Sequence, residues 1–97
     1  MSGSVAAVGV GTATCGQYST LYKANSEETE KHFIGWLDGF LSGLNVYALR
    51  KGERSKNLGS LQARKSLLHN YCDEHPLQDV GKAAMAIYDS LPANPPK

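Results

Sequence analysis

The strongest structural signal in the chain is the stretch Phe33-Ile34-Gly35-Trp36-Leu37-Asp38-Gly39-Phe40-Leu41-Ser42-Gly43-Leu44-Asn45-Val46-Tyr47-Ala48-Leu49. At about 100° per residue, its large apolar side chains fall on one broad arc, as an amphipathic α-helix requires. Asp38, Ser42 and Asn45 occupy most of the remaining arc. The pattern predicts a long central helix in a small helical domain.

Three glycines recur every fourth residue and form a second face of this helix, the glycine stripe: Gly35, Gly39 and Gly43. It lies beside the edge of the apolar arc that carries Trp36 and Tyr47. Each glycine costs roughly 1 kcal/mol relative to alanine inside a helix. Because glycine has no Cβ, we interpret the stripe as a place where another backbone approaches closely. On this hypothesis, Gly39→Leu overpacks the contact and destabilises the domain.

The glycine spacing is also typical of pairing faces in membrane helices. The apolar run from Phe33 to Leu49 is 17 residues long, or about 25 Å, which is short of the roughly 30 Å hydrocarbon core. Asp38 lies near its middle, where a charge costs roughly 3 kcal/mol. We therefore expect no membrane span.

The composition is that of one small, nearly neutral domain. The chain has 97 residues, with ten Lys and Arg against nine Asp and Glu. Such a balance gives no overall field that would attract nucleic acid or a membrane surface. Basic residues do gather between Arg50 and Lys65, but no aromatic residue lies among them, as single-strand binding would favour. We expect no nucleic-acid partner.

We expect three segments along the chain. Residues 1–13 form a flexible N-terminal segment, in which Met1–Ser4 are consistent with residues added for expression. Residues 14–91 form a single helical domain, and residues 92–97 form a disordered tail rich in proline. The fold class that follows is all-α, with four helices.

Local signals set the expected ends of these helices. Thr14 caps the first, from Cys15 to about Lys23, and Asn25 or Ser26 caps the central one, which Gly52 terminates. Ser60 caps the third, from Leu61 to about Glu74. Pro76 suits the first position of the fourth helix, whose apolar residues follow a heptad pattern: Leu77, Val80, Ala84, Ile87 and Leu91.

Cys15 and Cys72 are too few for a disulfide scaffold or a four-cysteine zinc site. Two alternatives remain open, a single disulfide or two buried thiols. A bridge across their separation of 57 residues would contribute roughly 4 kcal/mol. Domain stability is about 5–15 kcal/mol in total, so the bridge would decide whether the domain survives outside a cell.

The densest set of reactive side chains is His69, Cys72 and His75. With Cys15 they offer the atoms of a zinc site, and Cys72 beside a histidine could act as a nucleophile. Steps of three residues drift by about 60° around a helix, however, and no signature of a catalytic or nucleotide-binding motif is present. We therefore expect no catalytic residues, no metal and no cofactor.

Two short patterns resemble known families of small exported proteins. Thr14-Cys15 at the start of the first helix, Gly39-Phe40 before Leu44-Asn45, and Cys72 at the end of the third helix resemble the HdeA/HdeB periplasmic acid-stress chaperones. The segments Trp36-x-x-Gly39-Phe40-x-x-Gly43 and Tyr71-Cys72-x-x-His75-Pro76-Leu77 are similar to the Rap1a/Tai immunity group. These helical bacterial proteins neutralise type VI secretion effectors that attack peptidoglycan. The resemblance covers about residues 14–91.

The resemblance implies an HdeA-like fold, a periplasmic or secreted mature chain, and a disulfide between Cys15 and Cys72. The cysteines are further apart than the HdeA pattern leads us to expect, whereas the glycine stripe and Trp36 fit the immunity group better. The leading hypothesis is a non-enzymatic immunity-type protein that binds and neutralises an effector. The alternatives are an acid-stress chaperone that binds unfolded clients and, from another class, a small metal-dependent or thiol enzyme.

The residues expected to bind a protein partner or a second copy lie along the central helix and the loop after it. Val46 and His32 would form the rim of the groove, and the basic segment from Arg50 to Arg54 would steer an acidic partner. The candidate binding residues are Trp36, Gly39, Phe40, Gly43, Tyr47, Arg50 and Arg54.

Overall fold

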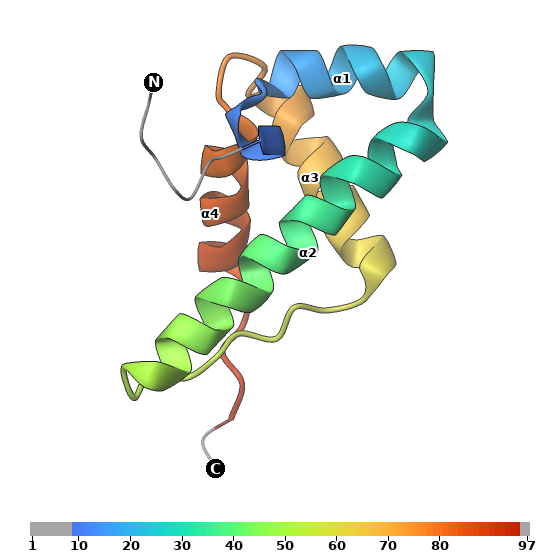
Figure 1. Ribbon diagram of the computed structural model, residues 1–97. Helices are drawn as coiled ribbons and strands as arrows, with labels where there is room; N and C mark the ends of the chain where they lie inside the picture. The colour runs from blue at the N-terminus through green and yellow to red at the C-terminus, as the bar shows by residue number, and fades with distance from the viewer. Residues whose placement is uncertain (1–8, 96–97) are drawn as a thin grey trace.

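The computed structural model describes residues 9–95, which form an all-α domain with one disulfide (Figure 1). Helix α1 runs across one end, α2 crosses the molecule diagonally, and α3 and α4 lie behind and beside it. The prediction of four helices is confirmed, and so is the bridge between Cys15 and Cys72. The elements are the 3-10 helix η2 (Gly9–Thr12) and the α-helices α1 (Cys15–Ala24), α2 (Ser26–Arg50), α3 (Leu61–Glu74) and α4 (Val80–Ser90).

Helix α2 starts and stops where the sequence predicts. The Asn25 side chain accepts a hydrogen bond from the Glu28 amide at 3.1 Å, which satisfies one of the free N–H groups of the first turn. At the other end, Gly52 has a φ of 78°, a conformation that favours glycine. The Glu53 amide then donates to the Ala48 carbonyl at 2.8 Å, as a Schellman motif requires.

The core lies where α1, α3 and α4 meet the apolar arc of α2. Leu37 and Leu41 are fully buried, with Phe33 and Ile34 beside them, as the periodicity predicts. One member of the predicted arc is misplaced, because Tyr47 is 61% exposed. The other buried core residues are Cys15, Tyr18, Leu68, Cys72, Val80, Ala83, Ala84 and Ile87.

Two of the three residues on the polar arc of α2, Asp38 and Asn45, contact other parts of the chain. Asn45 holds Lys56 in the loop between α2 and α3 by two hydrogen bonds, one from the Lys56 amide at 2.7 Å and one to its carbonyl at 2.9 Å. The Tyr88 hydroxyl donates to the same Asn45 carboxamide oxygen at 2.8 Å. Further along the helix, Arg64 donates to both carboxylate oxygens of Asp38. These contacts lay the long loop and the start of α3 against α2.

The prediction that the fourth helix starts at Pro76 is wrong. Helix α4 begins at Val80, and the Asp79 side chain caps it by accepting from the Lys82 amide at 2.7 Å. Residues 76–80 instead pair with the chain entering α1: the Cys15 amide donates to Gln78, and the Val80 amide to the carbonyl of residue 13, both at 2.7 Å. This pairing leaves Leu77, a predicted core residue, 94% exposed.

The predicted close contact at the glycine stripe is also wrong within this chain. A Cβ added at Gly35, Gly39 or Gly43 would meet nothing within 4 Å. The close approach in this region is at Gly11, where a Cβ would lie 2.5 Å from Cζ2 of Trp36. Helix η2 therefore covers the tryptophan, while the glycine stripe is exposed to solvent.

The expected end segments are partly structured. Residues 9–12 of the segment expected to be flexible form η2, and the remainder up to residue 8, including Met1–Ser4, lies outside the described residues. In the expected disordered tail, Ala93 forms an antiparallel bridge with Lys56. The Asn94 amide donates to the Ser55 carbonyl at 2.9 Å. Residues 96–97 also lie outside the described residues.

Candidate protein-binding surface

The predicted binding residues do not form one surface. Trp36 and Phe40 stack on each other with ring centroids 5.1 Å apart and pack against the core. The remaining five are exposed: Gly39, Gly43, Tyr47, Arg50 and Arg54. The structure therefore separates an inner aromatic pair from an exposed group along α2 and the following loop.

The exposed group is most apolar at the end of α2. Val46 is 53% exposed and Leu49 is 60% exposed, on either side of Tyr47. The Lys51 ammonium lies 5.1 Å from the centre of the Tyr47 ring. Arg54 points elsewhere, since its guanidinium donates to the Asn94 carbonyl at 3.5 Å. No helix of the described part of the chain is long and apolar enough to cross a membrane.

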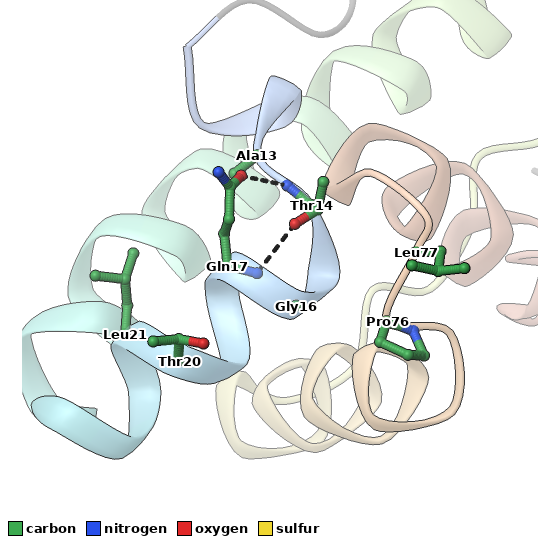
Figure 2. A pocket seen from close by; sticks show the side chains of 8 residues that line it. All are labelled: Ala13, Thr14, Gly16, Gln17, Thr20, Leu21, Pro76 and Leu77. Atoms are coloured by element: carbon green, nitrogen blue, oxygen red, sulfur yellow. Dashed lines mark hydrogen bonds between the residues drawn. The ribbon is translucent and has the colours of Figure 1, made fainter.

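A wide, shallow depression lies at the opposite end of the domain, between α1 and the loop before α4 (Figures 1 and 2). This α1 hollow has a volume of about 710 Å³. Figure 2 shows Thr20 and Leu21 of α1 on one side, and Pro76 and Leu77 on the other. The lining residues are Ala13, Thr14, Gly16, Gln17, Thr20, Leu21, Pro76 and Leu77.

Covalent and backbone bonds fix the two sides of the α1 hollow. The Cys15–Cys72 disulfide joins the first residue of α1 to the last turn of α3, with the two Cα atoms 4.7 Å apart. The Gly16 amide donates to the Pro76 carbonyl at 2.9 Å. Only a residue without a Cβ fits there comfortably, because a Cβ on Gly16 would lie 3.2 Å from that carbonyl oxygen. These bonds hold the two sides of the α1 hollow together.

The chemistry of the α1 hollow is apolar contact. Its two large exposed apolar side chains are Leu77, which is 94% exposed, and Leu21, which is 49% exposed. Thr14 and Gln17 use their side chains in a capping box, in which each accepts from the other's amide, at 2.8 and 3.0 Å. Small-molecule sites rely on a few converging polar groups to orient the ligand. This lining suits an apolar group of another protein better.

The disulfide removes the thiol chemistry that the sequence alone allows. Cys15 and Cys72 cannot act as zinc thiolates or as a nucleophile while they are bonded to each other. His69 faces Asp73 at 3.5 Å, and the His75 ring packs on Tyr71 with centroids 4.3 Å apart. Among residues 9–95, no group of three or more His, Cys, Asp or Glu side chains is placed to hold a metal ion.

Two tyrosines have perturbed acidities, and neither lines the α1 hollow. Burial raises the pKa of the Tyr18 hydroxyl, whose side chain lies in the core. Burial is also the largest cause that raises the pKa of Tyr88, which donates to Asn45. Both shifts follow from packing, because removal from water disfavours the phenolate.

Sequence reasoning missed Leu21 and Leu77 as surface residues. The heptad pattern of the last helix placed Leu77 in the core, and it could not reveal that residues 76–80 pair with the entry to α1. One local signal was present, because Asp79 stands directly before the apolar run that begins at Val80. Aspartate in that position is a preferred N-cap and marks the true start of the helix.

Comparisons with known proteins found no matching protein-family model, no matching curated protein and no matching solved structure.

Proposed function

We propose that this chain is an exported, non-enzymatic binding domain of the immunity type, which engages an effector protein through the α1 hollow and neutralises it. The observation that carries the proposal is Leu77, 94% exposed on a backbone held by the disulfide and by hydrogen bonds to α1. A leucine so placed contributes nothing to the core of its own domain. It is available to a partner.

The surroundings of Leu77 favour a protein partner. Single exposed apolar residues are common on protein surfaces, but Leu77 lies with half-exposed Leu21 along one apolar hollow. Protein interfaces concentrate their binding energy in a few residues and the pockets that receive them. The disulfide supports export, because disulfides persist in oxidising compartments.

The expected contribution of Leu77 to binding is measurable. Burying an exposed leucine side chain completely is worth roughly 1.5–3 kcal/mol. Every 1.4 kcal/mol changes a dissociation constant about tenfold. Since the side chain is almost fully exposed in the free domain, its replacement should affect binding without affecting folding.

The first prediction therefore concerns Leu77→Ser. The protein to test is a peptidoglycan-degrading effector, sought first among the proteins encoded beside the gene for this chain. We expect Leu77→Ser to weaken the complex about tenfold or more in a calorimetric titration, with the thermal unfolding midpoint unchanged. Met85→Ser is the matched control, because Met85 is also exposed, at 42%, but lies on α4 and does not line the α1 hollow.

Two results would contradict the proposal. If the effector forms no complex with the oxidised wild-type domain, the immunity role is wrong. If Leu77→Ser and Met85→Ser bind the effector as tightly as the wild type does, binding takes place away from the α1 hollow.

A further inference from the structure

One exposed face of α2 is centred on Gly39, with residues placed at equal distances along the helix on either side of it. This α2 outer face consists of Gly39 and three pairs of residues placed equally far from it along the helix. The pairs, at four, seven and eleven residues from Gly39, are Gly35 and Gly43, His32 and Val46, and Glu28 and Arg50. In an α-helix these offsets bring every side chain within about 40° of the direction of Gly39. All seven residues are exposed.

The centre of the α2 outer face is bare backbone. A Cβ placed on Gly35, Gly39 or Gly43 meets no atom within 4 Å. Three glycines on adjacent turns allow the backbone of a second helix to approach unusually closely, and Cα–H groups can then contact carbonyl oxygens. No other element among residues 9–95 packs closely against these three glycines.

The two ends of the α2 outer face carry opposite charges. Glu28 lies in the first turn of α2, where its carboxylate accepts from His32 at 2.9 Å, and Arg50 lies in the last turn. Arg50 forms no ion pair with any residue that the structure describes. A second α2 packed antiparallel would set Glu28 of each copy against Arg50 of the other. A parallel arrangement would set like charges together and repel.

The distances restrict the crossing angle. Glu28 and Arg50 each lie about 17 Å along the axis from Gly39. When two helices cross at about 20°, their axes diverge by only about 6 Å at that distance, whereas a crossing of about 50° separates them by about 14 Å. Long side chains span the smaller gap. The charge pairs therefore favour the shallow crossing.

We infer that the α2 outer face binds a second copy of this chain, with the two α2 helices antiparallel and a two-fold axis at Gly39. This interface is isologous, because each residue at one end meets its symmetric counterpart at the other. The charges set the orientation more than the affinity. A contact made by one helix from each protomer falls at the low end of interface areas, so the dimer is reversible.

This dimer uses a different face from the α1 hollow and does not depend on the proposed function. Sedimentation equilibrium of the oxidised full chain at concentrations up to about 1 mM measures it directly. The expected mass rises with concentration from 10.4 kDa towards twice that value. We expect Gly39→Leu to remain a folded monomer throughout, since the added side chain has free space in the protomer but blocks the two-fold contact.

Charge exchange tests the orientation. Glu28→Arg and Arg50→Glu should each raise the dissociation constant severalfold, because each places like charges against one another across the interface. The double variant with both changes should recover the wild-type constant, because opposite charges then face each other again with their positions exchanged. Two controls reverse one charge away from the face, Glu74→Arg at the end of α3 and Lys82→Glu on α4. We expect these controls to keep the wild-type constant.

Every other pattern of results overturns the inference. A wild-type chain that stays monomeric over this range has no such interface. A dimer that persists in Gly39→Leu is formed by another face. A dimer weakened by both single exchanges but not recovered in the double variant has a different orientation or a different partner surface. Circular dichroism of each variant confirms that it is folded.

Discussion

At the scale of single residues, Gly11 and Gly39 have the same intrinsic helix propensity but lie in opposite environments, one buried and one exposed. Gly11 is buried beneath the indole of Trp36, where a Cβ would lie 2.5 Å from Cζ2. Gly39 lies in the middle of an exposed helix face with no atom within 4 Å of a Cβ. The sequence predicted close contact at Gly39 because glycine is costly in a helix. It could not predict which glycine the chain itself covers.

These environments predict stability changes of opposite sign. Gly39→Ala should stabilise the monomer by about 1 kcal/mol, because alanine has the higher helix propensity and meets no neighbour. Gly11→Ala should destabilise by roughly 1–3 kcal/mol through overpacking against Trp36. Urea unfolding of dilute protein, where a weak dimer is dissociated, measures both.

The wild-type protein and the two variants should show the same denaturant m-value. If Gly39→Ala lowers the free energy of unfolding under these dilute conditions, Gly39 is covered within its own protomer and the placement of α2 is wrong.

At the scale of elements, the sequence predicted most of α2 but left open what its polar side contacts. Periodicity identified the buried positions, and the capping residues Asn25 and Gly52 marked both ends. A polar arc has the same sequence pattern whether it faces water or hydrogen-bonds to a loop. At Asn45 the structure shows a hydrogen-bonded loop, because the Asn45 carboxamide holds the backbone of Lys56. Such a pairing across 11 residues has no local signature.

Asn45→Ala should therefore lower the free energy of unfolding more than a typical substitution on a polar helix face does. It removes two hydrogen bonds to Lys56 and one from Tyr88, each worth about 1 kcal/mol. We expect a loss of roughly 2–3 kcal/mol in the free energy of unfolding. Ser42→Ala, an exposed neighbour on α2, is the control and should change stability by less than about 0.5 kcal/mol.

Thermal or urea unfolding distinguishes these outcomes. Equal stability of the Asn45→Ala and Ser42→Ala variants would mean that the loop from residue 51 to 60 is not held against α2.

At the scale of the whole molecule, the disulfide and the α1 hollow form one unit. The bridge closes 57 residues, which corresponds to roughly 4 kcal/mol of stability in the loop-entropy account. It also fixes the start of α1 against the end of α3, beside the loop that carries Leu77. The sequence pattern predicted the helices, and the two cysteines made a disulfide possible. The pattern could not predict which exposed residues share a surface, because Leu21 and Leu77 line one hollow only through the pairing of residues 76–80 with the start of α1.

The central claim is that a protein partner binds at the α1 hollow. Methyl NMR of the isotopically labelled, oxidised domain tests it most directly, during titration with the effector. We predict that the methyl resonances of Leu21 and Leu77 shift or broaden, while those of Val46 and Leu49 at the exposed end of α2 do not. Shifts confined to Val46 and Leu49, with Leu21 and Leu77 unchanged, would contradict the claim and place the partner on α2.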